Sequence, residues 1–212
     1  MERIKRYSPV TFAHTPARTQ VRNGWEVVLE YEDEATGPFL IDLSHIGKWD
    51  VQDENLSSLR PAGLVIPEDS EHCAFTESFF VNLIKWNWAT IWHFSQDMPD
   101  FAGDVAFTNV TEAYALLALL GKEVFSIMEK VSALDLLSPE RKPPFLTLGP
   151  VLHVRSQVVV LARGVDGPAV LVACPRGYGQ SMAEALLEAG KEWGLRPGGE
   201  KIFTGMVALM NQ

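Results

Sequence analysis

The chain has 212 residues, of which 47% are hydrophobic and 21% are charged. A chain of this length and composition can bury one sizeable apolar core, which argues against extended disorder. Its 18 basic and 27 acidic residues give a formal net charge of −9. Because no dense Lys/Arg cluster accompanies this charge, nucleic acid is not expected as a partner.

No targeting or membrane segment is expected. The N-terminal sequence lacks the apolar stretch of an export signal, and no apolar run reaches the roughly 20 residues that span a bilayer. The two cysteines, Cys73 and Cys174, form no CxxC pair, so we expect free thiols. No repeat of fixed period stands out. We therefore expect a cytoplasmic protein in which residues 1–212 form a single domain.

The first half of the chain predicts strands followed by a helix. Residues 25–32 and 39–51 carry β-branched and aromatic residues that predict two strands. Residues 53–77 are rich in proline, glycine and acidic residues, which predicts a loop with one short strand at residues 63–66. Across residues 81–94, apolar side chains recur with the i, i+3, i+7 spacing of one helical face, which predicts a helix packed on the core.

The centre of the chain is ambiguous. Residues 114–120 are continuously apolar and are followed by Gly121, after which helical spacing continues to Val131. Periodicity alone allows either one long helix or a buried strand followed by a helix. Residues 138–144 are polar and proline-rich, which predicts an internal connector.

The last third predicts a hairpin and a helix. Residues 157–163 and 169–173 are two β-rich runs joined by a glycine-containing turn at 164–167. A helix is expected over residues 181–193, ending at Gly194. The mixture of interspersed elements predicts the α+β class.

Four short blocks of sequence occur in a fixed order: GWE at residues 24–26, DLSHIGK at 42–48, YALLALLG at 114–121, and EALLEAG at 184–190 with GLRP after it. In type and order these blocks resemble the aminomethyltransferase family, the T-protein of the glycine cleavage system. The second block is the most specific, because the family has DLSHMGK there. The resemblance also favours a buried strand, then Gly121, then a helix in the ambiguous centre.

The resemblance implies an α+β folate-binding domain of two intertwined ferredoxin-like units, here without the family's C-terminal β-barrel. It implies tetrahydrofolate as cofactor, whose N5 takes a methylene carbon from an aminomethyl group on a lipoyl carrier protein while ammonia leaves. Ile46 stands where the family has a methionine against the folate, and Asn82 resembles the asparagine of its V-V-N motif. These two are the candidate cofactor-binding residues.

The chain departs from the family at its acidic positions. Where the family has an aspartate that orients the folate, this chain has Ile66 and Pro67, and where a glutamate binds the pterin it has Ala169. An unpaired buried pterin group costs roughly 1–3 kcal/mol. Glu68 and Asp69 lie nearby, but a one-residue shift in a strand turns a side chain to the opposite face. No catalytic residue is therefore assigned.

Three further features have a structural interpretation beside a functional one. A possible metal-binding loop has spacing that matches no standard site and is more typical of a solvated loop, so no metal is predicted. Its possible ligands are Glu68, Asp69, Glu71, His72 and Cys73.

His45 could act as a general base, but without an identifiable nucleophile we interpret it as a hydrogen-bonded strand residue. Residues 176–179 precede a helix and could hold an anion, although a simple turn is favoured.

The tryptophans of residues 86–92 can be divided by helical spacing. Trp88 and Trp92 fit the predicted core face, where packing accounts for them. Trp86 falls outside that face and is the candidate for an exposed interface anchor.

Two functions follow from these observations. The first is a T-protein-like protein of one-carbon metabolism, which would be a tetrahydrofolate-dependent aminomethyltransferase if it is active. The second is a non-catalytic subunit or binding module of a multi-chain complex, comparable to the small T-protein-like subunits of sarcosine oxidases, in which the pocket has been repurposed for another ligand. The missing carboxylates favour the second, in which a partner chain supplies the absent groups.

Overall fold

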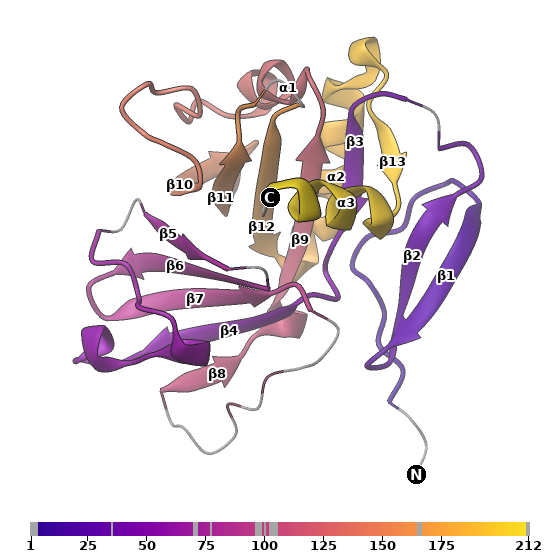
Figure 1. Cartoon of the computed structure of the whole chain (residues 1–212). Coiled ribbons are helices and arrows are strands. Elements are labelled where there is room, and N and C mark those ends of the chain that lie inside the picture. Colours follow the sequence, from indigo (N-terminus) through magenta and orange to yellow (C-terminus); the bar gives the residue numbers. More distant parts are fainter. Residues whose placement is uncertain are drawn as a thin grey trace.

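The computed structural model describes residues 4–34, 36–69, 72–76, 78–95, 99, 101, 106–164 and 167–210. In this part of the chain three sheets and three α-helices form (Figure 1). The strands are β1 (Pro16–Arg22), β2 (Trp25–Tyr31), β3 (Phe39–Asp42), β4 (Gly47–Gln52), β5 (Cys73–Phe75), β6 (Phe79–Lys85), β7 (Trp88–His93), β8 (Phe107–Asn109), β9 (Tyr114–Leu120), β10 (Phe145–Val151), β11 (Val154–Ala162), β12 (Ala169–Pro175) and β13 (Arg196–Gly198). The helices are α1 (Val124–Val131), α2 (Gly179–Ala189) and α3 (Glu200–Met210).

The chain builds one sheet, leaves it to build another, and then returns. The six-stranded sheet has the order β10-β11-β12-β9-β3-β13, and only the β13–β3 pair is parallel. Between β3 and β9 the chain forms the five-stranded sheet, β5-β6-β7-β4-β8. The β1–β2 hairpin is a separate two-stranded sheet, on the right of Figure 1. The connection between β3 and β4 therefore crosses from the six-stranded sheet to the five-stranded sheet.

The six-stranded sheet is buried on both faces, which explains why its central strands are continuously apolar. On one face, Leu117 and Val172 belong to the core formed with α1 and α2. On the other face, Leu116 and Leu171 belong to the core formed with β6, β7 and α3. Because successive side chains of a strand point to opposite faces of the sheet, the same strands contribute residues to two different cores.

The α+β class is confirmed, and so are several of the predicted elements. The ambiguous centre is a strand, β9, followed by α1. Strands β11 and β12 form the expected antiparallel hairpin. Helix α2 and a short 3-10 turn are followed by Gly194, whose φ of 72° is the left-handed conformation expected of a glycine after a helix.

The predicted connector at residues 138–144 lies between α1 and β10. Arg163 holds it in place, because its guanidinium donates to the backbone oxygens of Leu136 (2.6 Å), Ser138 (2.8 Å) and Arg141 (3.0 Å). The strands before and after it, β9 and β10, belong to the same six-stranded sheet. The connector therefore does not separate one sheet from the other.

The helix predicted over residues 81–94 is wrong. This segment is an antiparallel hairpin, β6 and β7, in which Phe80 pairs with Trp92 and Val81 with Ile91. Both faces of these strands are buried, so apolar residues occur at nearly every position and match helical spacing by coincidence. The turn between the strands contains no glycine or proline that would have revealed it.

Two strand predictions also need correction. Residues 39–51 are not one strand but two, β3 and β4, which belong to different sheets. Residues 63–66 form no strand, because Pro61–Gly63 is a 3-10 turn and the next residues are irregular. Ile66 is nevertheless buried, in the core on the outer face of the five-stranded sheet.

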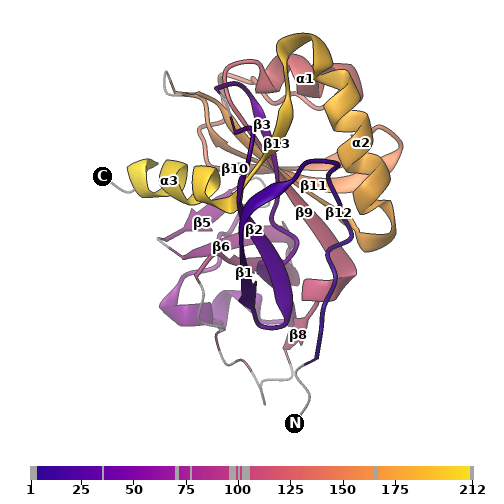
Figure 2. The same ribbon diagram turned by 90° about the vertical axis from the view of Figure 1, so that its right-hand side faces the viewer.

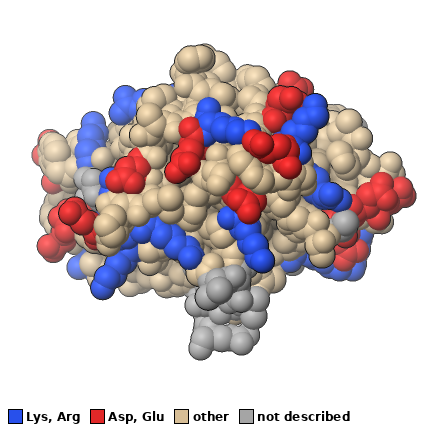
Figure 3. Space-filling view, turned by 90° about the horizontal axis from the view of Figure 1, so that it is seen from above, with Lys and Arg blue, Asp and Glu red and all other residues tan. Residues whose placement is uncertain are grey.

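The surface carries charges of both signs. On the face seen from above, over the helices α1 and α2, basic and acidic side chains are interspersed instead of gathering into a patch of one sign (Figure 3). None of the helices in the described ranges is long and apolar enough to cross a membrane.

Candidate functional site

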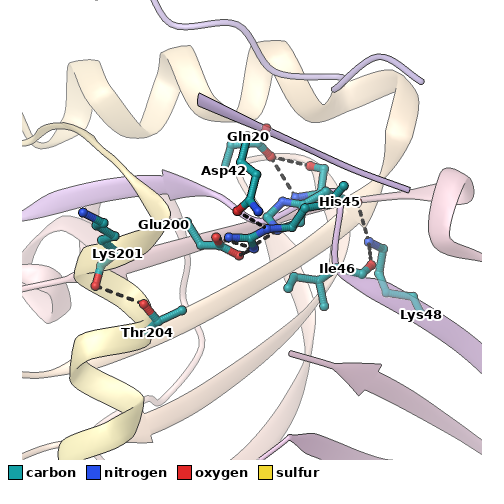
Figure 4. A network of polar contacts seen from close by, with 10 residues as sticks. Gln20, Asp42, His45, Ile46, Lys48, Glu200, Lys201 and Thr204 are labelled. Carbon is teal, nitrogen blue, oxygen red and sulfur yellow. Dashed lines mark hydrogen bonds and ion pairs between the residues drawn. The ribbon is translucent and has the colours of Figure 1, made fainter. Parts of the chain in front are cut away.

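The DLSHIGK segment forms the connection between the two large sheets. Strand β3 ends at Asp42 in the six-stranded sheet, and β4 begins at Gly47 in the five-stranded sheet. Between them the amide of Ile46 donates to the oxygen of Leu43 over 2.9 Å, which closes a tight turn. We call residues 42–48 the joint (Figure 4).

Asp42 stabilises the joint through three hydrogen bonds. Its Oδ1 accepts from the backbone amide of Ser44 (2.9 Å) and from the Ser44 hydroxyl (2.6 Å), and its Oδ2 accepts from the hydroxyl of Ser8. The Ser44 hydroxyl also accepts from the amide of Leu116 in β9, over 3.2 Å. The carboxylate is therefore occupied in holding the turn against the neighbouring strand and the N-terminal segment.

The side chain of Lys48 binds backbone oxygens of the joint from the protein core. Its side chain is 1% exposed, and its Nζ donates to the backbone oxygens of Ser44 (2.8 Å) and Ile46 (2.7 Å). Burial lowers the pKa of Lys48 to about 7, an effect that the Asp42 carboxylate opposes and the Arg176 charge reinforces. The ammonium group therefore satisfies backbone oxygens in the core and does not face a ligand site.

His45 belongs to a part-buried cluster with Glu200 and Arg22. Its Nε2 lies 2.8 Å from Oε1 of Glu200, the first residue of α3, whose Oε2 lies 2.6 Å from Nη1 of Arg22. Burial raises the pKa of Glu200, but the hydrogen bonds and charges of His45 and Arg22 outweigh this effect, so the net pKa is lowered. The prediction that His45 is hydrogen-bonded is confirmed, although it lies in the turn and not in a strand.

Sequence reasoning missed Glu200. Its position at the start of α3 and its acidic side chain suit a helix N-terminus, which is a common and unspecific arrangement. Its partner His45 lies 155 residues earlier in the chain. No local pattern could therefore identify Glu200 as part of the joint.

The two candidate cofactor-binding residues lie between the large sheets. Ile46 is 4% exposed and borders a hollow of about 20 Å³, which has room for a water molecule but not for a pterin. Asn82 is fully buried, and its Nδ2 lies 3.5 Å from Oγ1 of Thr90, which donates to Oε1 of Gln157 over 3.1 Å. This polar chain links β6 and β7 to β11 across the two sheets. Folate binding by these residues remains a prediction.

The positions of the family's acidic residues are apolar and enclosed. Ile66 is 3% exposed and Ala169 is fully buried. The adjacent Asp69 is 80% exposed and pairs with His72, so it is turned away from the core. Among the described residues, neither Glu68 nor Asp69 therefore places a carboxylate in the core beside Ile66.

The remaining predicted ligands do not assemble into a site. Glu71 lies outside the described residues, and among those described no group of three His, Cys, Asp or Glu side chains could hold a metal ion. Cys73 and Cys174 are free thiols. Burial raises the pKa of Cys73 to about 12 and that of Cys174 to about 11, which makes both poor nucleophiles.

The tryptophans of the β6–β7 hairpin and the turn before α2 are also candidate functional features of the sequence. Trp86 is 71% exposed in the turn between β6 and β7, whereas Trp92 is 2% exposed in the core between the sheets. Trp88 is half-buried against the same core. Residues Arg176–Tyr178 form a 3-10 turn that leads into α2, as the simpler interpretation predicted.

A larger cavity lies beside the joint. Its volume is about 360 Å³, and it is lined by the N-terminal segment, the β1–β2 hairpin, Asp42 and His45. We call it the N-terminal cavity. Figure 2 shows the N-terminal segment running past the hairpin towards α2.

The chain is similar to known proteins in sequence and in fold. No protein-family model matches the chain. Sarcosine oxidase subunit alpha of Rhizobium meliloti (strain 1021) is 32% identical over 102 residues, which make up 45% of this chain and 10% of that protein. The chain thus spans about a tenth of the length of this curated relative.

Two solved structures share the fold. Heterotetrameric sarcosine oxidase from Corynebacterium sp. U-96, in complex with pyrrole 2-carboxylate, has a TM-score of 0.63 at 9% identity, covering 73% of this chain and 84% of that chain. Glycine cleavage system aminomethyltransferase T from Bartonella henselae has a TM-score of 0.57 at 14% identity, covering 87% and 56%. The fold implied by the sequence resemblance is therefore confirmed.

Proposed function

We propose that this chain, a divergent relative of aminomethyltransferase T and sarcosine oxidase, is a T-protein-like subunit of a multi-chain, sarcosine-oxidase-like enzyme of one-carbon metabolism. In this assembly it contributes the folate-binding fold without the usual catalytic carboxylate. Residues 1–212 act as a single domain. A partner chain supplies the reacting groups.

The observation that carries the proposal is the extent of the match to the heterotetrameric enzyme. The similarity covers 84% of that chain but only 56% of aminomethyltransferase T. A likeness along most of one chain favours a subunit equivalent to that chain. The comparisons give no comparable support to a lipoyl carrier protein as partner.

The site geometry supports a scaffold role. Asp42 and Lys48 bond to protein groups within the joint, His45 bonds to Glu200 of α3, and Ile66 and Ala169 are enclosed in apolar cores. Because these polar groups have partners and these acidic positions are lost, the chain offers little for general acid–base chemistry at the family's usual positions.

Co-expression tests the assembly. The chain, carrying an affinity tag, is co-expressed with a sarcosine oxidase subunit alpha-like chain from the same source, and native mass spectrometry measures the stoichiometry. We expect a complex of fixed composition that oxidises sarcosine only when all its subunits are present. A chain that stays alone, or a complex equally active without it, would contradict the proposal.

Substitution of the nearest carboxylates tests the scaffold role. Glu68 is exposed and Asp69 is 80% exposed. The double variant Glu68→Ala, Asp69→Ala should leave the turnover of the complex unchanged, because neither side chain reaches the enclosed positions. A loss of turnover with the complex still assembled would show that this chain does supply a carboxylate.

A second candidate function is tetrahydrofolate binding, which the match over 87% of this chain to aminomethyltransferase T favours. In this function Ile46 and Asn82 would contact the folate. Calorimetric titration with tetrahydrofolate and its 5-formyl derivative, using the chain alone and in the complex, measures this. Tight binding by the isolated chain would contradict a scaffold-only role, whereas binding in neither state would exclude the folate function.

A further inference from the structure

A small hollow lies between α1 and the chain that follows it, at the top of Figure 1. Its volume is about 100 Å³. It is lined by two acidic and five apolar residues, which are Glu129, Asp135, Phe125, Met128, Leu134, Leu136 and Leu137. None of these residues lines the N-terminal cavity or the hollow beside Ile46. We call this space the α1 hollow.

Hydrogen bonds hold one wall of the α1 hollow in place. Oδ1 of Asp135 accepts from the amide of Leu137 over 3.2 Å, which fixes the turn that carries both residues. The guanidinium of Arg163 donates twice to the backbone oxygen of Leu136, over 2.6 and 3.1 Å. The wall is therefore preformed, and a ligand that binds there does not have to order this part of the chain.

The interior of the hollow is apolar, and its edge is exposed. Met128 and Leu136 are buried, whereas Leu137 is 50% exposed. The volume exceeds the roughly 10–15 Å³ that holds one water and falls short of the roughly 300–1,000 Å³ of small-molecule sites. The hollow therefore suits a single apolar side chain of another protein. The flexible thioether of Met128 can adapt to the shape of that side chain.

Both charged residues of the lining are acidic. Glu129 and Asp135 are exposed, and neither forms an ion pair with another described residue. Lys130, which follows Glu129 in α1, pairs instead with Glu192, and its Nζ lies 4.2 Å from the ring centroid of Trp193. Two carboxylates at the hollow therefore have no counter-charge from the described part of this chain.

The arginines that contact the connector bind other groups. The guanidinium carbons of Arg163 and Arg141 lie 5.0 and 5.4 Å from the ring centroid of Phe145. Arg163 also donates to the backbone oxygens of Leu136 and Ser138. Neither arginine lines the hollow. The lining thus carries two negative charges and no positive one.

We propose that the α1 hollow is a docking site for a basic segment of a partner chain. One apolar side chain of the segment enters between Phe125 and Leu137, and a Lys or Arg on either side of it pairs with Glu129 and Asp135. A second copy of this chain is disfavoured as the occupant, because each copy carries a formal net charge of −9. The docking site belongs to this chain alone, so it does not depend on whether the partner is part of an oxidase.

Methyl NMR titration of the isolated chain with capped tripeptides tests the occupant. The peptides have the sequences Lys-Leu-Lys, Glu-Leu-Glu and Lys-Gly-Lys. We expect Lys-Leu-Lys to bind in the millimolar range and to shift the methyl signal of Met128, because one side chain and two exposed ion pairs give weak binding. Each of the other peptides should bind about three- to tenfold more weakly. Equal binding of Lys-Leu-Lys and either of the others, or no shift of Met128, would overturn the proposal.

Two matched variants locate the apolar contact. Leu137→Ala truncates the exposed side chain of the lining and should weaken Lys-Leu-Lys binding about three- to tenfold. Val65→Ala truncates a side chain that is 60% exposed outside the hollow and should leave binding unchanged. Both side chains are exposed, so neither change should disturb folding. An equal effect of the two variants, or no effect of Leu137→Ala, would show that the peptide binds elsewhere and would overturn the proposal.

The charged contact has its own pair of variants. Glu129→Gln with Asp135→Asn removes both carboxylates of the lining, and the asparagine keeps an oxygen for the amide of Leu137. This double variant should abolish the preference for Lys-Leu-Lys over Glu-Leu-Glu. Glu54→Gln with Glu188→Gln changes the net charge equally outside the hollow and should keep the preference. Equal losses in the two double variants would show that only net charge selects the peptide, which would overturn the docking site.

Discussion

The joint and the polar chain between the sheets each contain a fully buried polar residue, but the two residues differ in how well their polar atoms are hydrogen-bonded. Lys48 in the joint is 1% exposed and Asn82 in the polar chain is 0% exposed. Lys48 makes two short hydrogen bonds, whereas Asn82 makes one at 3.5 Å and its Oδ1 has no partner among the described residues. Burial alone therefore does not indicate how much a polar residue stabilises the fold. The pairing of each polar atom decides it.

The largest effect is expected from Glu200→Ala. This change leaves the Arg22 charge, 17% exposed, without the carboxylate that it shares with His45. Breaking a buried ion pair from one side costs about 3–5 kcal/mol, which urea unfolding followed by circular dichroism would measure. The control Glu188→Ala removes a pair with Lys191 that is 73% exposed on the glutamate side, and should cost less than about 1 kcal/mol. Equal losses would contradict the role of Glu200.

Ser44→Ala tests the backbone attachment of the joint. It removes a donor to Asp42 and leaves the amide of Leu116 without its acceptor. We expect a loss of about 1–3 kcal/mol in the free energy of unfolding. Ser181→Ala, which removes an exposed hydroxyl bonded to the oxygen of Tyr178, should change it by less than about 0.5 kcal/mol. A negligible loss for Ser44→Ala would show that the turn holds without this serine.

Lys48→Met tests the pH dependence of the joint. The pKa of Lys48 is about 7 in the folded chain and about 10.4 in an unfolded one. Between these values the unfolded chain binds a proton that the folded chain has released, so this group makes stability rise with pH. The stability of the wild type relative to the methionine variant should rise by up to about 1.4 kcal/mol per pH unit above pH 7. Parallel stability curves from urea unfolding would refute this.

The smallest effect is expected from Asn82→Leu. The leucine removes an amide whose oxygen is already unpaired and fills a similar volume in the apolar core. The free energy of unfolding should change by no more than about 1 kcal/mol in either direction. A loss as large as that expected for Ser44→Ala would remove the distinction between the two regions. The same variant in the folate titration separates a binding role from a structural one.

The elements that sequence patterns predicted well are those with unambiguous local signals. Helix α2 has one apolar face and a left-handed Gly194 after it. The β11–β12 hairpin has β-branched runs on both sides of a glycine turn. The segment of β6 and β7 failed because both faces are buried, which removes the period-two alternation that marks a half-exposed strand.

The candidate site was predictable only in part. The DLSHIGK block located the joint, whereas the prediction that Ile66 and Ala169 stand at the family's acidic positions rests on the resemblance. The N-terminal cavity was not predicted, because its walls come from Phe12, Tyr31 and Asp42, which share no motif spacing.

The sequence by itself determined the α+β class and the apolar central strands. These properties depend on residue types and local backbone preferences, which adjacent residues express directly. Only the tertiary structure decided that His45 bonds to Glu200, that Thr90 links Asn82 in one sheet to Gln157 in the other, and that a cavity lies beside Asp42. Such contacts join residues far apart in the chain, and their geometry arises from how the sheets and helices pack.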